Sequence, residues 1–137
     1  MLAPFGLDLA VCKVAMKPGK PVWVGRASGR IVVGLPGNPS AAMVTARLFL
    51  APILAGPGGR NPDDAWSWRY VRLAASLDAC GERETFVRAA NSSRGAVPAA
   101  SQDASGQKAL AAADLLLRRR PGEPALGVGE TVLALPF

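Results

Sequence analysis

Two loops rich in proline and glycine enclose two short apolar runs within residues 16–40, and this stretch constrains the fold more than any other part of the 137-residue chain. The apolar runs, residues 22–24 and 31–33, consist mainly of β-branched residues. Such runs bounded by Gly and Pro predict strands. Because ligands of α/β folds usually dock at one edge of the sheet, both loops, residues 17–21 and 34–39, are expected at or near such an edge.

The first loop, Lys17-Pro18-Gly19-Lys20-Pro21, favours an anionic ligand. Lys17 and Lys20 supply mobile positive charge. Pro18 and Pro21 stiffen the backbone around them, because their rings fix φ and remove two N–H donors. Two lysines in a loop are also typical of an ordinary solvated surface, and this alternative stays open.

The second loop leads into a helix predicted over residues 40–55. Asn38 is a good N-cap, and Pro39 suits the first helical position. No acidic residue lies in the first turn, so free N–H groups there would favour a phosphate or another oxyanion. A plain turn between a strand and a helix is the alternative. Pro52 lies late enough to bend or close the last turn.

A composition break divides the chain. Residues 56–64 are rich in Gly, Pro, Asn and Asp and predict a linker, since they cannot easily form a helix or a strand. The predicted division is an α/β part over residues 1–57, a linker over residues 58–66 and a β part over residues 67–137. The predicted elements are strands over residues 7–16, 22–25, 30–34, 68–73, 85–90, 96–100, 115–118 and 131–135, a turn over residues 27–29 and a short helix over residues 106–113. The strands of the second part predict a small barrel or sandwich.

Composition excludes several function classes. The chain contains no histidine, which excludes a Ser-His-Asp triad and a His-ligated metal within it. Cys12 and Cys80 lack a Cys-x-x-Cys context, so reduced core cysteines are expected rather than a zinc or redox site. No apolar run approaches the ~20 residues that a membrane span needs. The start of the chain lacks the pattern of a secretion signal, so a cytoplasmic location is expected.

The net charge of +6 suggests an anionic partner, and it is concentrated in the first part. Residues 1–57 hold six basic residues against one acidic residue, Asp8, whereas residues 58–137 are nearly balanced. Nucleic acid is the rival ligand, but the chain shows no basic helix, no interleaved aromatic platform and no zinc-finger spacing, so nucleic acid is not expected. The run of residues 118–120, three arginines, is expected to be a solvated strand end.

The two loops resemble the signature of the molybdopterin molybdenumtransferase family, whose relatives include the E domain of gephyrin. The similarity continues through residues 83–89, 102–105 and 129–132. It implies the C-terminal part of a three-layer molybdopterin-binding α/β domain followed by a small C-terminal β-barrel domain.

The resemblance also implies a reaction: molybdate is inserted into the dithiolene of adenylylated molybdopterin, AMP is released, and Mg²⁺ is required. The implied partners are adenylylated molybdopterin, molybdate and a second copy of the chain in a homodimer. Charge-assisted hydrogen bonds could hold molybdate, a tetrahedral dianion, without a covalent protein step. The implied substrate-binding residues are Lys17, Lys20, Pro21, Pro36, Gly37, Asn38, Pro39, Ser40, Arg88 and Ser105.

Some of these assignments have simpler alternatives. Arg88 lies in an alternating strand, where an exposed charge needs no explanation. Ser105 could only cap the short helix that follows. The family often has Asn-Pro-Val-Ser, whereas here Ser40 directly follows Pro39 and Ala41 takes the usual hydroxyl position, so a hydroxyl contact would shift by one residue.

The family's α/β domain begins with a Gly-rich stretch and acidic residues that help to hold magnesium, and these motifs are not found here. No magnesium ligand or catalytic acid is therefore named. We expect the 137-residue chain alone to be inactive. The alternative is a non-catalytic, gephyrin-like binding or assembly module.

Overall fold

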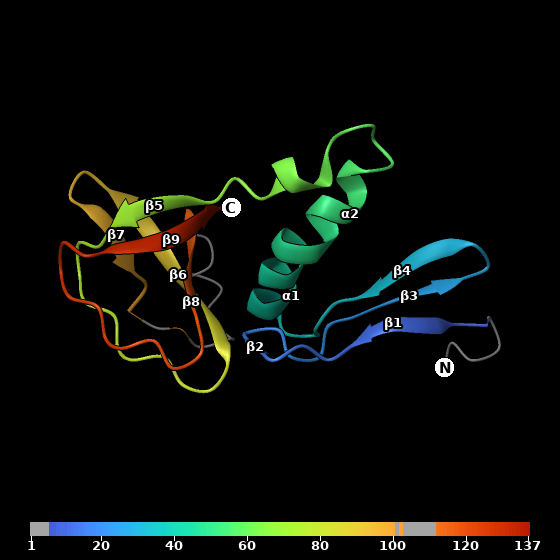
Figure 1. Ribbon diagram of the computed structural model, residues 1–137, viewed down its shortest axis with the longest axis horizontal. Helices are drawn as coiled ribbons and strands as arrows, with labels where there is room; N and C mark the ends of the chain where they lie inside the picture. Colours follow the sequence, from blue (N-terminus) through green and yellow to red (C-terminus); the bar gives the residue numbers. More distant parts are fainter. Residues whose placement is uncertain (1–5, 101, 103–111) are drawn as a thin grey trace.

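The computed structural model describes residues 6–100, 102 and 112–137 and contains two sheets with a helical segment between them. A three-stranded sheet lies at one end of the molecule and a six-stranded sheet at the other (Figure 1). In the first part four strands precede the helices, and strands dominate the second part, so the chain has an α/β fold.

The three-stranded sheet confirms two of the predicted strands. It is antiparallel, with β3 (Trp23–Ala27) between β1 (Asp8–Cys12) and β4 (Arg30–Gly34). A two-residue turn joins β3 to β4, with φ of 50° at Ser28 and 73° at Gly29. Positive φ at both turn residues matches the right-handed twist of a hairpin.

The predicted single strand over residues 7–16 is wrong. The chain breaks at Lys13, whose φ is 65°, and continues into a separate strand, β2 (Met16–Lys17). This strand pairs in parallel with β6 (Glu84–Ser92) of the other sheet. Sequence periodicity could not indicate this pairing, because two-residue strands carry no periodic signal.

The predicted helix forms with an irregular middle. It comprises α1 (Pro39–Thr45), a π-helical turn (Ala46–Leu50) and α2 (Ala51–Ala55). The π-helical turn directly precedes Pro52, which has no N–H to donate to the carbonyl four residues earlier. That carbonyl belongs to Leu48, and it accepts the indole N–H of Trp66 at 2.9 Å. The segment after α2 thus supplies a donor where the helix lacks one.

The predicted linker contains a short 3₁₀ turn (Pro62–Ala65), in which the Asn61 side chain accepts from the Asp63 N–H at 3.1 Å. The expectation that this stretch forms no helical structure is therefore wrong for four residues. The Asx cap and the proline at the first helical position explain why these residues coil.

The six-stranded sheet confirms every strand predicted after the linker, with shifted ends. Its strand order is β2-β6-β8-β9-β5. β7 stands outside this order and pairs with β6. Apart from β2, all pairings are antiparallel. The elements not yet given bounds are β5 (Arg69–Arg72), β7 (Gly95–Pro98), β8 (Leu115–Arg119) and β9 (Thr131–Pro136). One bridge joins Leu73 to Ala96 and favours closure into a barrel. The barrel and the third layer of the α/β part stay predictions, and the short helix predicted over residues 106–113 falls largely outside the described residues.

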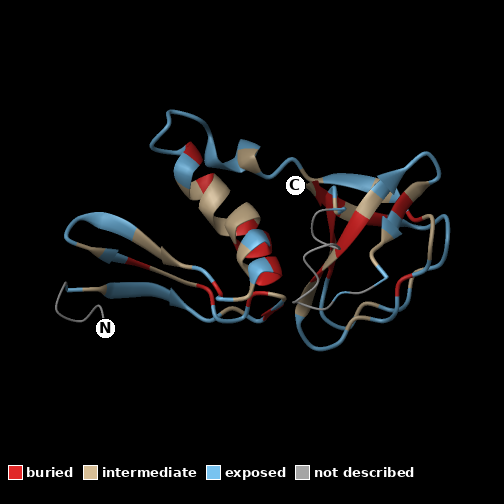
Figure 2. Ribbon diagram, turned by 180° about the vertical axis from the view of Figure 1, so that it is seen from behind, coloured by how far each residue is buried: buried red, intermediate tan, exposed pale blue. Residues whose placement is uncertain are grey.

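Two apolar clusters form the core, and β8 contributes to both. Leu115 and Leu117 face one cluster within the six-stranded sheet. Leu116, on the opposite face, joins a cluster that also holds Val44 and Leu48 of the helical segment. Because successive strand residues point to opposite faces, an uninterrupted apolar run suits a strand covered on both sides. Figure 2 shows the buried residues gathered on these strands and on α1, whereas β1 is exposed.

Within the described residues, no helix combines the length and the apolar character needed to cross a bilayer.

Candidate functional site

The Lys-Pro-Gly-Lys-Pro loop packs against α1 through its glycine. Gly19 is buried with φ of 114°, and a Cβ added there would lie 2.5 Å from Thr45 Cγ2. Only glycine fits without movement of its neighbours. Thr45 is itself buried, and its hydroxyl donates to the Ala41 carbonyl at 2.8 Å. The loop backbone is therefore fixed while the side chains of Lys17 and Lys20 remain exposed.

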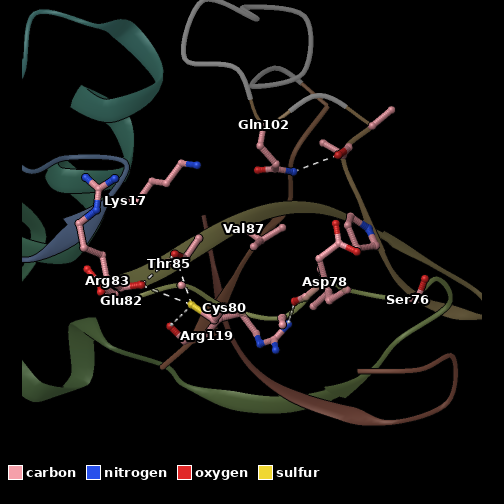
Figure 3. Close-up of a pocket in the computed structure, with 16 residues that line it drawn as sticks. Lys17, Ser76, Asp78, Cys80, Glu82, Arg83, Thr85, Val87, Gln102 and Arg119 are labelled. Atoms are coloured by element: carbon pink, nitrogen blue, oxygen red, sulfur yellow. Dashed lines mark hydrogen bonds between the residues drawn. The ribbon is translucent and has the colours of Figure 1, made fainter. Parts of the chain in front are cut away.

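Lys17 lines a cavity of about 470 Å³, together with residues of β6, of the segment before β6 and of the segment after β7. The parallel pairing places Lys17 opposite Thr85 of β6, so the strand register fixes where the lysine begins. Figure 3 shows Lys17 and Arg83 at one end of the cavity and Asp78 toward the other. Among the described residues, the lining includes Lys17 but not Lys20.

A buried arginine supports the wall of this cavity. Arg119 is 2% exposed, and its guanidinium donates to the Glu123 carboxylate at 3.1 Å, to the Asp78 carbonyl at 3.0 Å and to the Pro124 carbonyl. These bonds hold the Asp78 segment, which has no regular secondary structure of its own. Arg119 thus has a structural role, because it holds the Asp78 segment in the cavity wall.

The expectation of a solvated arginine run is wrong for two of its three residues. Besides the buried Arg119, Arg118 forms an ion pair with Glu84 and lies 5.6 Å from the centroid of the Trp68 ring. Only Arg120 is exposed. Carbonyls and two carboxylates satisfy these guanidinium groups, and two of the partners, Glu84 and the Asp78 carbonyl, come from distant parts of the sequence.

Arg88 and Ser40 meet in the interior. Each is 1% exposed, and the Arg88 Nη1 donates to the Ser40 hydroxyl at 2.8 Å. The alternative of an exposed charge at Arg88 is therefore wrong. The bond joins the start of α1 to the middle of β6, so it couples the two parts of the chain.

The side chain of Gln102 forms two hydrogen bonds with the backbone of Arg88. Its side-chain carbonyl accepts from the Arg88 N–H, and its amide donates to the Arg88 carbonyl, both at 3.0 Å. Gln102 also lines the cavity. The segment after β7 is in this way held against β6 beside Lys17.

The start of α1 offers fewer free donors than expected. Asn38 accepts from the Ala41 N–H through its side chain at 3.2 Å and from the Ala42 N–H through its carbonyl at 2.8 Å. Pro39 has no N–H. The predicted N-cap is confirmed. Its bonds engage two of the N–H groups in the first turn, and the anion site predicted at this helix start stays a prediction.

The remaining predicted site residues differ in how far they are buried. Pro21, Gly37 and Pro39 are exposed, whereas Pro36 is buried. Ser105 lies outside the described residues. Sequence reasoning did not single out Asp78, Arg83 or Gln102 as cavity residues, because none of them shows its spatial neighbours in a local pattern.

The cysteines are both free. Cys80 is half-buried in the cavity wall, where its Sγ lies 3.3 Å from the Arg83 carbonyl. Cys12 is exposed on β1, so the expectation of two core cysteines is wrong. In the part of the chain that the structure describes, no three His, Cys, Asp or Glu residues form a group able to hold a metal ion. The described residues therefore do not fit a magnesium site.

Known proteins resemble the chain in sequence. The family described as "Probable molybdopterin binding domain" matches residues 3–56. Molybdopterin molybdenumtransferase 2 of Mycobacterium tuberculosis is 43% identical over 77 residues, which cover 56% of this chain and 19% of the relative. Molybdopterin molybdenumtransferase of a Nostoc species is 34% identical over 92 residues, 64% of this chain and 21% of the relative. The chain thus matches about a fifth of the length of these relatives.

The fold is shared over a longer stretch. The crystal structure of a molybdopterin biosynthesis MoeA protein from Pyrococcus horikoshii superposes with a TM-score of 0.83 and 25% identity, covering 98% of this chain and 33% of that one. A molybdenum cofactor biosynthesis protein from Pyrococcus furiosus shares the fold, with a TM-score of 0.74 at 21% identity over 96% of this chain and 46% of that one. In sequence and in fold, the chain therefore resembles molybdopterin molybdenumtransferases, and its residues 3–56 match the molybdopterin-binding family.

Proposed function

We propose that this chain supplies the oxyanion-binding part of an enzyme of molybdenum cofactor biosynthesis, which inserts molybdate into adenylylated molybdopterin and releases AMP. The single observation that carries the proposal is the position of Lys17, exposed at the entrance of a cavity formed by both parts of the chain. The resemblance to molybdopterin molybdenumtransferases supports the proposed reaction. The position of Lys17 in the cavity supports its proposed role.

The proposed role of the residues is to bind and orient, with no covalent step on the protein. The ammonium groups of Lys17 and Lys20 donate charge-assisted hydrogen bonds to the tetrahedral dianion. Gly19 keeps the loop against α1, so both lysines project from a fixed backbone. Arg88 acts through Ser40 as a positioning residue, since its guanidinium is buried against that hydroxyl.

Magnesium stays a proposal for the reaction, but no step is assigned to it here because the described residues do not fit a site for it. We further propose a homodimer with adenylylated molybdopterin and molybdate as ligands. The chain alone is expected not to release AMP from adenylylated molybdopterin, because it offers no described carboxylate cluster for a metal-bridged phosphate.

Calorimetric titration with molybdate tests the proposal. Lys17→Ala and Lys20→Ala should each weaken binding, since a charged hydrogen bond contributes about 1.5–3 kcal/mol, roughly ten- to a hundred-fold in affinity. Arg30→Ala is the matched control, because it removes the same charge from the exposed β3–β4 turn. Equal losses in all three variants would show diffuse charge attraction and overturn the proposal.

A non-catalytic binding or assembly module remains the second candidate. The observation in its favour is the apolar surface of the three-stranded sheet, where Val11, 40% exposed, and Ile31, 49% exposed, lie on one face. Exposed apolar side chains close together are typical of surfaces that another chain covers. AMP release by the chain alone would exclude a purely non-catalytic role.

A further inference from the structure

A second polar cavity lies between the helical segment and the linker. Its volume is about 330 Å³. Figure 1 shows the linker returning alongside α2 before it continues to β5. The cavity shares no lining residue with the cavity beside Lys17, so the two are separate. Its described lining consists of Arg47, Ala51 and Ala55 from the helical segment and Arg60, Asn61, Asp64, Ala65 and Ser67 from the chain that follows.

Hydrogen bonds within the chain fix the lining of this cavity. The Arg60 N–H donates to the Ala55 carbonyl at 3.0 Å, across the turn that ends α2. The Arg47 side chain reaches from the helical segment to the linker, where its Nη1 donates to the Ala65 carbonyl at 2.7 Å. The linker is therefore attached to the helical segment at two points of the lining.

The Arg47 guanidinium has donors that the fold does not use. Its Nε and Nη1 donate to backbone carbonyls, whereas its Nη2 has no hydrogen-bond partner among the described residues. The ion pairs between described residues involve only arginines of β8, so no described carboxylate neutralises Arg47. Burial lowers the pKa of Arg47 from its ordinary value. An anion beside this guanidinium would offset the cost of burying its charge.

The linker side of the cavity adds further donors. Arg60 and Ser67 are exposed, and neither side chain forms a hydrogen bond with another described residue. The Asn61 side chain accepts through its carbonyl from the Asp63 N–H, which leaves its amide N–H groups as donors. Among the described lining residues, Asp64 supplies the only carboxylate. The lining therefore combines two cations with one acceptor group and an excess of donors.

Two guanidinium groups from different segments favour a phosphate over a carboxylate. One bidentate guanidinium engages both oxygens of a carboxylate, whereas a phosphate monoester has three terminal oxygens and can bridge two guanidinium groups. The volume of about 330 Å³ lies within the range of small-molecule sites, roughly 300–1,000 Å³, so a phosphate ion alone would fill only part of it. Asp64 would repel a second anionic group but accepts hydrogen bonds from hydroxyl groups.

We propose that this cavity is a second ligand site, which binds a small phosphate monoester whose carbon chain carries hydroxyl groups. Arg47 and Arg60 hold the phosphate, while Asp64 and Asn61 bond to the hydroxyl groups. Arg47 also donates to the Pro136 carbonyl at the end of β9. A bound ligand therefore stabilises the junction of the helical segment, the linker and the six-stranded sheet.

Calorimetric titrations of the full chain test this assignment, in a buffer free of phosphate and sulfate. The probes are glycerol 3-phosphate, inorganic phosphate and succinate. Since a phosphate could also reach the cavity beside Lys17, each titration is repeated with Lys17→Ala. Glycerol 3-phosphate should bind in that background, at least about tenfold more tightly than either of the other two probes.

Substitutions in the Lys17→Ala background test the residues. Arg60→Ala should lower the affinity for glycerol 3-phosphate about tenfold or more, because it removes a charged donor. Arg30→Ala, which removes an exposed arginine at the start of β4, should leave this affinity unchanged. Asp64→Ala should narrow the preference for glycerol 3-phosphate over inorganic phosphate, because it removes both a hydroxyl acceptor and a charge that repels phosphate.

Thermal unfolding gives a second measurement. Saturating glycerol 3-phosphate should raise the midpoint of Lys17→Ala, because a ligand that binds only the folded chain stabilises it. The same addition should leave the midpoint of the Lys17→Ala, Arg60→Ala double variant nearly unchanged. Equal midpoints of these two variants without ligand would confirm that Arg60→Ala leaves the fold intact, so a loss of binding would then report on the site.

Three results would overturn the assignment. Loss of glycerol 3-phosphate binding in Lys17→Ala would place the phosphate in the other cavity, and equal losses at Arg60→Ala and Arg30→Ala would show attraction to net charge alone. Glycerol 3-phosphate that binds no more tightly than inorganic phosphate would exclude the ligand class. None of these results affects the proposed function, which fails instead if molybdate binding is indifferent to Lys17→Ala.

Discussion

At the scale of single residues, buried arginines carry the polar structure of this chain. Arg88 and Arg119 are almost completely buried, and each bonds to a group far away in the sequence: Arg88 to Ser40 and Arg119 to the Asp78 carbonyl. A buried guanidinium is costly unless it is fully hydrogen-bonded. Both residues therefore depend on the loops and helices that pack around the six-stranded sheet.

Removal of the Ser40 hydroxyl should destabilise the chain. Ser40→Ala leaves one buried donor of Arg88 without its 2.8 Å partner, and we expect the free energy of unfolding to fall by about 1–3 kcal/mol. Urea denaturation monitored by tryptophan fluorescence measures the change. Ser93→Ala is the control, since residue 93 is exposed in the β6–β7 turn. Equal, small effects in both variants would show that the Ser40–Arg88 bond contributes nothing.

Sequence reasoning at this scale succeeded for local contacts and failed for distant ones. It predicted the Asn38 cap and a turn over residues 27–29, where the two-residue hairpin turn lies, because both depend on neighbours within four positions. It did not predict that Arg88 reaches Ser40, 48 positions away. It also did not single out Asp78 and Arg83 as residues of the Lys17 cavity, because only the β2–β6 pairing brings them together.

At the scale of elements, the helical segment is completed by the chain that follows it. Pro52 removes a helical donor, and the Trp66 indole donates to the Leu48 carbonyl instead. The contact therefore attaches the linker to the helical segment. It also explains why the linker, which is rich in Gly, Pro and Asp, has a defined conformation.

Trp66→Phe should therefore cost about 0.5–1.5 kcal/mol beyond any change in packing, because the Leu48 carbonyl loses a donor. The size of that loss should depend on Pro52. In a Pro52→Ala background, residue 52 regains an N–H that can satisfy the helix, and the cost of Trp66→Phe should shrink. A double-mutant cycle by urea denaturation measures the coupling. Strictly additive effects would show that the indole bond and the proline are unrelated.

Strand prediction succeeded where alternation or β-branched runs were long enough to see. All five antiparallel strands of the six-stranded sheet, β5 to β9, were predicted within two residues at each end. The division of residues 7–16 was missed. Its cause is a backbone turn at Lys13 and a pairing partner in β6, and neither leaves a periodic trace in the sequence.

At the scale of the whole molecule, the two sheets are covered unequally. The six-stranded sheet is packed on both sides of β8, whereas every residue of β1 is exposed. Edge strands with exposed apolar residues are prone to pair with other chains. The first part should therefore control how the chain associates.

We expect the chain to self-associate through the three-stranded sheet. Val11→Lys and Ile31→Lys should each lower the average mass, because they place charge on the same apolar face of the sheet. Val128→Lys is the control: residue 128 is 69% exposed in a loop of the second part. Light scattering coupled to size exclusion measures the mass over a range of concentrations. A monodisperse monomer of the parent chain would contradict the expectation.

The last prediction concerns how the two parts unfold together. Arg47 of the helical segment donates through Nε to the Pro136 carbonyl at 2.8 Å and through Nη1 to the Ala65 carbonyl at 2.7 Å. It therefore ties the helix to both the linker and the end of β9. Burial lowers the pKa of Arg47 from its ordinary value, but arginine still remains charged throughout the neutral range. The contribution of this contact to stability should accordingly be constant between about pH 6 and pH 9.

Arg47→Met keeps much of the aliphatic packing and removes both bonds, leaving two carbonyls without their donor. We expect a lower midpoint of thermal unfolding and a broader transition, because the variant loses one of the contacts that couple the two parts and keeps the apolar cluster of Val44, Leu48 and Leu116. Calorimetry at pH 6 and pH 9 measures both effects. Arg60→Met, at an exposed residue after α2, should leave the transition unchanged. A loss of stability at Arg47→Met that differs strongly between the two pH values would contradict the model of a permanently charged tie, and would point instead to a titrating group that the arginine holds in place.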